Sequence, residues 1–180
     1  MRGKIHISNQ LDHQQVRKGI FLVLLHADRV PPHIGLMVND QYHSLAIKGQ
    51  ELNVRGEVLL KNISVRKIPS VFIEIEKHPV FSNDHLGECF AEEVKQFDKV
   101  GGDDTCLSPV KLFFSEFYAI RRDKIDLVFD LLEELEKNHF IAGAYGANLG
   151  ALKGNNFYLQ PYDRQQLDKQ IREETAKLRK

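Results

Sequence analysis

Short apolar runs separated by turn residues dominate the first half of the chain, a pattern that is typical of β-strands. The longest run, GIFLVLL, is continuously apolar and therefore predicts a strand that is buried on both faces. Asn39-Asp40-Gln41 supplies turn residues between two of the runs and predicts a β-hairpin with a three-residue loop. The predicted strands lie at 19–25, 33–38, 42–48, 57–60 and 71–76.

In the second half, apolar residues recur at three- and four-residue intervals, which indicates amphipathic helices. Leu86, Phe90 and Val94 form one such stripe, and Ser108, followed by a proline, is suited to begin the next helix. The predicted helices lie at 84–98, 108–118, 123–138 and 163–180, with a break at 99–105. The glycine-rich segment GAYGANLGALKG (143–154) predicts a connector or a loop that closes over a pocket.

Strands followed by helices predict an α+β fold rather than alternating βαβ units. We expect an antiparallel sheet of four to six strands, or a partial barrel, from the first half, packed against the helices of the second. Residues 1–160 form the expected single α+β domain, because a chain of 180 residues fits one hydrophobic core. The amphipathic helix within 161–180 is expected to dock on this domain or to bind a partner, for example a second copy in a homodimer.

Composition and charge argue against several classes of protein. Lys plus Arg and Asp plus Glu both number 25, so no net charge attracts nucleic acid or anionic lipid. No apolar run approaches the roughly 20 residues of a membrane-spanning helix, and residues 1–18 lack the pattern of a secretory signal. Cys89 and Cys106 are the two cysteines, and a reducing compartment would keep both as thiols. We therefore expect a cytoplasmic protein with no nucleic-acid partner and no membrane span.

Cys106 is the first candidate for chemistry. It lies in GGDDTCLSPVKLFF, after an acidic, glycine-containing loop and directly before a predicted helix. Unpaired amides and the dipole at a helix N-terminus favour a thiolate, and a nearby histidine would favour it further. A buried cysteine that only fills space is the alternative interpretation.

His33 is the second candidate, because it opens a predicted strand after the rigid VPP segment. A side chain at that position projects at the edge of the sheet, where binding and catalytic sites are concentrated. An ordinary strand-end histidine is the alternative interpretation.

The order of these motifs resembles the circularly permuted papain-like cysteine hydrolases, the group that includes NlpC-type amidases and lecithin retinol acyltransferase. PHIGLMVNDQYHSL (32–45) is similar to the histidine hairpin of that family, and DDTCLSPVKLFFSEFY (103–118) is similar to its cysteine helix. The resemblance covers residues 19–120 and implies a permuted papain-like fold with Cys106 as nucleophile and His33 as general base.

The same resemblance implies a cysteine hydrolase or acyltransferase that acts on an amide, a thioester or an ester through an acyl-enzyme. The substrate would be a small molecule, a peptide or a lipid, and the sequence does not choose among them. Backbone amides near Thr105 to Leu107 would hold the oxyanion.

A residue that orients the histidine is harder to identify. The family uses a polar residue on the strand after the histidine, but a three-residue loop at 39–41 places the apolar Leu45 and Ile47 at the matching positions. The same loop places His43 on the face of His33 but four residues further along, at about 13 Å. Glu74, on the polar face of VFIEIE, is therefore the predicted third catalytic residue.

Two other functions remain open. His26, Asp28, His33 and His43 lie close in sequence and could ligate a metal in a metal-dependent hydrolase, although no HExxH or paired CxxC motif supports this. A non-catalytic binding domain of papain-like shape is the other alternative, since a fold does not establish an activity. GAYGANLGALKG lacks the spacing of a phosphate-binding loop, and no nucleotide or other cofactor is predicted.

Overall fold

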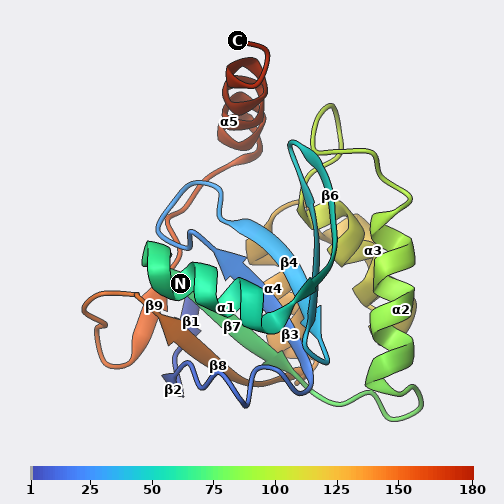
Figure 1. The fold of residues 1–180 in the computed structure, drawn as a ribbon, viewed down its shortest axis with the longest axis vertical. Coiled ribbons are helices and arrows are strands. Elements are labelled where there is room, and N and C mark those ends of the chain that lie inside the picture. The colour runs from blue at the N-terminus through green and yellow to red at the C-terminus, as the bar shows by residue number, and fades with distance from the viewer. Residues whose placement is uncertain (1) are drawn as a thin grey trace.

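A seven-stranded sheet forms the centre of the computed structural model, which describes residues 2–180 (Figure 1). Its order is β2-β8-β7-β3-β4-β5-β6, and a separate two-stranded sheet pairs β1 with β9. Neighbours in the large sheet are antiparallel, except that β2 and β8 are parallel. The strands are β1 (Lys4–His6), β2 (Asn9–Gln10), β3 (Ile20–Leu25), β4 (His33–Val38), β5 (Gln41–Ala46), β6 (Gly49–Arg55), β7 (Ser70–Ile75), β8 (Ile141–Ala147) and β9 (Asn156–Tyr158). The protein is therefore α+β, with a mixed and mainly antiparallel sheet.

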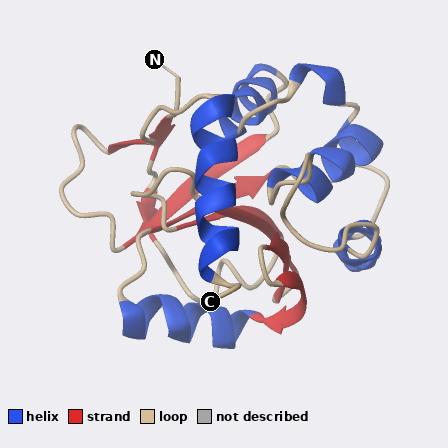
Figure 2. Cartoon of the chain, turned by 90° about the horizontal axis from the view of Figure 1, so that it is seen from above, coloured by secondary structure: helices blue, strands red, loops and turns tan. Residues whose placement is uncertain are grey.

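Helices cover both faces of this sheet (Figure 2). The helices are α1 (Gly56–Arg66), α2 (Asn83–Val94), α3 (Leu107–Tyr118), the 3-10 helix η1 (Arg122–Lys124), α4 (Val128–Lys137) and α5 (Arg164–Lys177). Alternate residues of β3 serve the two faces, which explains its continuously apolar sequence. Phe21 packs on the face of α1, whereas Leu22 packs on the face of α2, α3 and α4. The predicted double burial of this strand is confirmed.

The helices predicted in the second half are present, and the predicted break falls between α2 and α3. The helix predicted from 123 starts at Val128, because η1 and a short extended stretch precede it. Sequence periodicity indicated these helices because each buries apolar residues in the same hydrophobic core.

One predicted strand is a helix. EVLL at 57–60 belongs to α1, in which Leu59, Leu60 and Ile63 are buried while Val58 and Val65 are exposed. The four-residue window contained only apolar residues after its first position, so it could not show the helical spacing that Ile63 completes. The expectation that 19–76 is mostly strand was wrong for this segment.

Five strands were not predicted, namely the short β1, β2 and β9 and the longer β6 and β8. β6 alternates exposed and half-buried residues along the edge of the sheet, so its sequence GQELNVR carries a weak apolar signal. β8 lies in the glycine-rich segment that was expected to be a loop, and it pairs with β7. A β-carbon at Gly146 would collide with the end of the Leu149 side chain, so glycine lets Leu149 pack closely on this strand. Of the glycine-rich segment, only residues 148–154 form a connector, which leads from β8 to β9. The sheet is therefore larger than expected, and with β2 and β6 at its two edges it is open rather than a barrel.

The C-terminal helix α5 docks on the domain through two residues. Leu167 and Ile171 are its buried side chains, whereas Leu178 near the end of the chain is exposed. Asp163 caps the helix by accepting a hydrogen bond from Gln166 N–H. In Figure 1, α5 rises from the end of the domain at which β4 begins. No helix within residues 2–180 is long and apolar enough to cross a membrane.

Candidate active site

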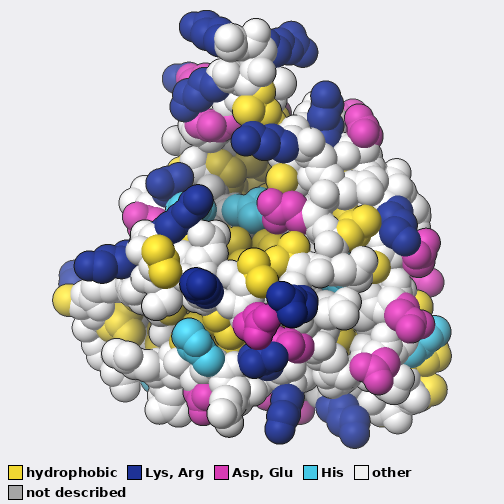
Figure 3. All heavy atoms as spheres, viewed as in Figure 1, with side chains coloured by type: hydrophobic (Ala, Val, Ile, Leu, Met, Phe, Trp, Pro, Cys, Tyr) yellow, Lys and Arg dark blue, Asp and Glu magenta, His cyan; other side chains and the backbone are white. Residues whose placement is uncertain are grey.

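A cavity of about 240 Å³ lies between the start of β4, the start of α3 and the buried side of α5. Four separate segments form its walls: the loop before β4, the end of β5, the loop before α3, and α5. Figure 3 shows this side of the molecule, with histidine and acidic side chains gathered in a hollow below α5. The cavity therefore joins residues that are far apart in the sequence.

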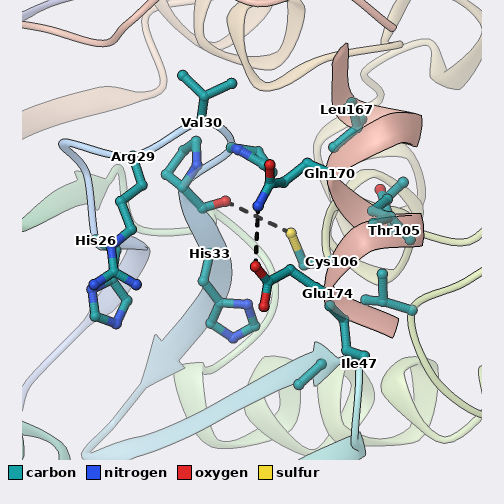
Figure 4. Close-up of a pocket in the computed structure, with 15 residues that line it drawn as sticks. His26, Arg29, Val30, His33, Ile47, Thr105, Cys106, Leu167, Gln170 and Glu174 are labelled. Atoms are coloured by element: carbon teal, nitrogen blue, oxygen red, sulfur yellow. Dashed lines mark hydrogen bonds between the residues drawn. The ribbon is translucent and has the colours of Figure 1, made fainter. Parts of the chain in front are cut away.

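Cys106 and His33 both line this cavity (Figure 4). His33 is the first residue of β4, and the cis Val30–Pro31 peptide lies in the loop that precedes it. The Cys106 thiol donates toward the carbonyl oxygen of Pro32, the residue before His33, at 4.0 Å, and interaction with Cys106 raises the pKa of the His33 imidazole. The structure thus brings together the two residues that the sequence singled out as nucleophile and base.

Cys106 lies in the first turn of α3. Its φ and ψ of −60° and −20° are helical, although the helix is assigned from Leu107. Thr105 and Ser108 cap this end reciprocally: Thr105 N–H donates to Ser108 Oγ at 2.9 Å, and Leu107 N–H donates to Thr105 Oγ1 at 3.1 Å. The cysteine therefore stands at the positive end of the helix dipole.

These caps also decide which amides could hold an oxyanion. The N–H groups of Thr105 and Leu107 are already donated to hydroxyl oxygens. Within residues 2–180, Cys106 N–H donates no hydrogen bond. Of the three backbone N–H groups expected to hold the oxyanion, that of Cys106 is therefore the one available to do so.

A buried hydroxyl connects His33 to a carboxylate. Ser44, which is fully buried, has its Oγ 3.0 Å from His33 Nε2 and donates a hydrogen bond of 2.7 Å to Glu51 Oε2. The direct separation of His33 Nε2 and Glu51 Oε2 is 3.8 Å. The groups therefore follow in the order Cys106, His33, Ser44 and Glu51. The Glu51 carboxylate acts on the His33 imidazole partly through the Ser44 hydroxyl.

The β-hairpin register explains why sequence analysis missed Ser44. The turn has two residues, Asn39 and Asp40, both with positive φ, and it pairs Gly35 with Ser44. A three-residue loop would have shifted β5 by one residue and turned Leu45 toward His33 instead. Positive φ at two successive turn positions is typical of Asn and Asp in two-residue hairpins. The Asn39-Asp40 pair was therefore the signal for the correct register.

The glycine of the His-x-Gly motif has a packing role. A β-carbon at Gly35 would lie 2.6 Å from the ring and from the hydroxyl of Tyr42. Tyr42 is buried beside this site, and burial raises the pKa of its hydroxyl well above the usual range. Gly35 therefore lets Tyr42 lie across the strand next to Ser44.

The electrostatics favour a charged imidazole. Burial lowers the pKa of His33, but its interactions with Cys106 and Glu51 outweigh burial and raise it to about 9. Interaction with His33 and the hydrogen bond from Ser44 lower the pKa of Glu51, and burial opposes them. The imidazole side chain is 26 % exposed. The site thus stabilises an imidazolium between a thiol and a carboxylate at neutral pH.

Glu74 is not part of this site. Its carboxylate accepts a 2.8 Å hydrogen bond from Tyr145. In the sheet register, Ser70 lies in line with His33, and Glu74 is four residues further along β7, about 13 Å away. Glu51 is the carboxylate beside His33, the role that was expected for Glu74. It was missed because β6, the strand that carries it, was not predicted.

The histidines proposed as metal ligands are not assembled. His43 lies on the opposite face of the sheet, where its Nδ1 accepts a 3.0 Å hydrogen bond from Asn53 N–H and its ring packs edge-on against Phe90. Burial lowers the pKa of His43 to about 4, with Lys95 contributing. In the part of the chain that the structure describes, no group of three or more His, Cys, Asp or Glu side chains is placed to hold a metal ion.

Comparisons with known proteins add no assignment. No protein-family model, no curated protein and no solved structure matches this chain. The arguments about function therefore rest on the residues of the cavity.

Proposed function

We propose that the protein is a cysteine hydrolase or acyltransferase in which Cys106 is the nucleophile and His33 the acid and base. The observation that carries this proposal is the meeting of Cys106 and His33 in one cavity, backed by Ser44 and Glu51. The resemblance of 32–45 and 103–118 to the permuted papain-like hydrolases supports the same roles. A binding domain without catalysis would not need a buried hydroxyl and a carboxylate aimed at its histidine.

The reaction begins with attack on a carbonyl carbon. The Cys106 thiolate forms the new carbon–sulfur bond, and the Cys106 N–H stabilises the negative charge that develops on the carbonyl oxygen. His33 gives its proton to the leaving oxygen, nitrogen or sulfur as the bond to it breaks. The products of this step are an acyl-enzyme and the protonated leaving group.

A second step returns the enzyme to its starting state. His33, now neutral, takes a proton from water or from an acceptor, which attacks the acyl-enzyme carbonyl. The carbon–sulfur bond breaks, and Cys106 leaves as a thiolate beside the imidazolium. Ser44 and Glu51 support both steps, because they hold the ring in one orientation and stabilise its positive charge.

Trapping the acyl-enzyme tests this function. The protein is mixed with 4-nitrophenyl acetate, and its mass is followed by intact-protein and peptide mass spectrometry. We expect one acetyl group on Cys106 with release of one 4-nitrophenol in a burst. Cys106→Ala should abolish the burst and His33→Ala should slow it strongly, whereas the matched control Cys89→Ala should leave it unchanged. Equal acetylation of both cysteines, or no acetylation, would contradict the proposed enzymatic function and favour the non-catalytic binding domain.

A further inference from the structure

A second cavity adjoins the first and shares one wall with it. It has a volume of about 800 Å³ and lies between β5, β6 and the end of α1. His26, Arg29, His33 and Ala46 line both cavities, whereas Cys106 lines only the first and Glu51 only the second. His33 therefore stands at the junction of two spaces, with the nucleophile on one side and the orienting carboxylate on the other.

The cavity on the side of Cys106 has a mainly apolar wall. Val30, Ile47 and Val100 from the domain line it together with Leu167 and Ile171 from α5. Leu167 and Ile171 are only 6 % and 8 % exposed. The polar side chains that α5 adds, Gln170 and Glu174, hydrogen-bond to each other at 3.2 Å, so part of their polarity is satisfied within the helix. An acyl group held on Cys106 must extend into this space.

The wall of the cavity on the side of Glu51 is about half apolar, and most of its charged side chains are cationic. Arg29, Arg66 and Lys67 line it, and none of the three forms a salt bridge within residues 2–180. Asp28 and Glu51 are the acidic residues on this wall, and Glu51 is paired with His33. The positive charges therefore exceed the negative ones, which favours an anionic group.

We propose that the substrate binds divided between the two cavities that meet at His33. Its apolar acyl group lies in the cavity beneath α5, and its anionic leaving group lies in the cavity beside α1. The shared lining makes this division possible, because the two cavities meet at His33, which must protonate the leaving atom while the acyl carbon bonds to Cys106. The substrate class is thus an ester, thioester or amide that joins an apolar acid to a negatively charged alcohol, thiol or amine. This inference rests on the proposed function and specifies its substrate.

A matched set of four thioesters tests the proposal. Hexanoyl and methoxyacetyl groups are each joined to 2-mercaptoethanol, which is neutral, and to 2-mercaptoethanesulfonate, which is anionic. We expect kcat/KM to be about tenfold higher for hexanoyl than for methoxyacetyl. We also expect it to be several-fold higher for the sulfonate than for the neutral thiol, with this second preference falling as salt is added.

Variants of the cavity walls test which cavity is responsible for each preference. Arg66→Gln with Lys67→Gln should remove the sulfonate preference and keep the acyl preference, while Lys61→Gln, on α1 outside the cavity lining, should change neither. Ile171→Ala should reduce the hexanoyl preference, while Lys169→Ala on the same helix should not. Melting curves of each variant show that the fold is kept.

The outcomes separate the two proposals. Thioesters that acylate Cys106 without either preference, or with only one of them, overturn the divided substrate and keep the hydrolase. Preferences that survive the cavity variants also overturn it. Failure of all four thioesters and of 4-nitrophenyl acetate to acylate Cys106 would remove the hydrolase, and the divided substrate with it.

Discussion

Two cysteine–histidine pairs occur in this molecule, and their surroundings differ. At the start of α3, Cys106 lines the same cavity as His33. On α2, the Cys89 thiol lies 3.5 Å from His85 Nε2. Both pairs place a cysteine near a histidine, so the proximity of the two residues does not by itself define a reactive site.

The two pairs differ in the groups that surround the histidine and the cysteine. His33 is backed by Ser44 and Glu51, which favour its positive charge, and Cys106 is at a helix N-terminus. Cys89 lies in the middle of α2. Burial raises the pKa of Cys89, and the nearby carboxylates, Glu93 first among them, raise it further. One region places a charged imidazole and a helix N-terminus beside its cysteine, and the other places carboxylates beside its cysteine.

The largest expected contrast is the rate at which the two thiols are alkylated. At pH 7, Cys106 should react with iodoacetamide at least about tenfold faster than Cys89, because an ordinary thiol, with a pKa of about 8.5, is only a few per cent thiolate. His33→Ala should remove most of this advantage. Peptide mass spectrometry over pH 5–10 measures both cysteines in one sample, so Cys89 is the internal control. Equal rates in the unmodified protein would contradict the comparison.

The next effect concerns the residues behind His33. Ser44→Ala and Glu51→Gln should each lower kcat/KM for an ester about tenfold or more, because the imidazole loses its orientation and its charge partner. Interactions with Cys106 and with Glu51 together raise the pKa of His33 to about 9 against the effect of burial, so Glu51→Gln should also move the alkaline limb of the pH–rate profile to lower pH. Stopped-flow rates over pH 5–10 measure both changes.

A conservative variant separates positioning from folding in this test. Ser44→Thr keeps the hydroxyl between His33 and Glu51 and should retain most of the activity. Ser44→Ala with a normal melting temperature and normal activity would show that the hydroxyl is only a satisfied buried group.

A smaller effect is expected on stability in the α2 region. Glu93 is 3 % exposed, and neither of its carboxylate oxygens has a hydrogen-bond partner within residues 2–180. Burial, and then the neighbouring Glu116, raise the pKa of Glu93 to about 9. The folded protein therefore keeps a proton that the unfolded chain releases above about pH 4.3. Stability should fall as pH rises from there to about 9, by at most ~1.4 kcal/mol per unit.

Glu93→Gln removes this titration and should raise the free energy of unfolding by about 1 kcal/mol or more at pH 8. Urea denaturation of both proteins at pH 5, 7 and 8.5 measures the effect. The gain should grow with pH, and parallel curves for the two proteins would show that Glu93 is not held neutral.

Sequence patterns gave the two central site residues because each follows a local rule. Cys106 precedes a strong helix start, and His33 follows a rigid proline segment into an apolar strand. These features are contained in a few neighbouring residues. Their meeting in space was suggested only by the resemblance to the permuted papain-like hydrolases.

The other half of the site depends on pairing between strands. Ser44 faces His33 only because the hairpin turn has two residues, and a register shift by one residue exchanges the two faces of the strand. Glu51 lies on an edge strand with few apolar residues, so no periodic pattern marked it. Glu74 was chosen for its place on a polar strand face, but the sheet order puts it far from His33 along the strands. Local propensity does not contain this information.

The smallest expected effect is the matched counterpart of the His33 variant. His85→Ala should change the alkylation rate of Cys89 at pH 7 by less than about twofold, because Cys89 lies beyond the first turn of α2, where the helix dipole no longer helps, and carboxylates surround it. Cys106 in the same sample serves as the reference for the alkylating agent. A large fall in the rate of Cys89 would mean that imidazole contact alone sets thiol reactivity in this protein. The role assigned to Ser44, Glu51 and the helix N-terminus would then be unnecessary, since the same contact would work without them.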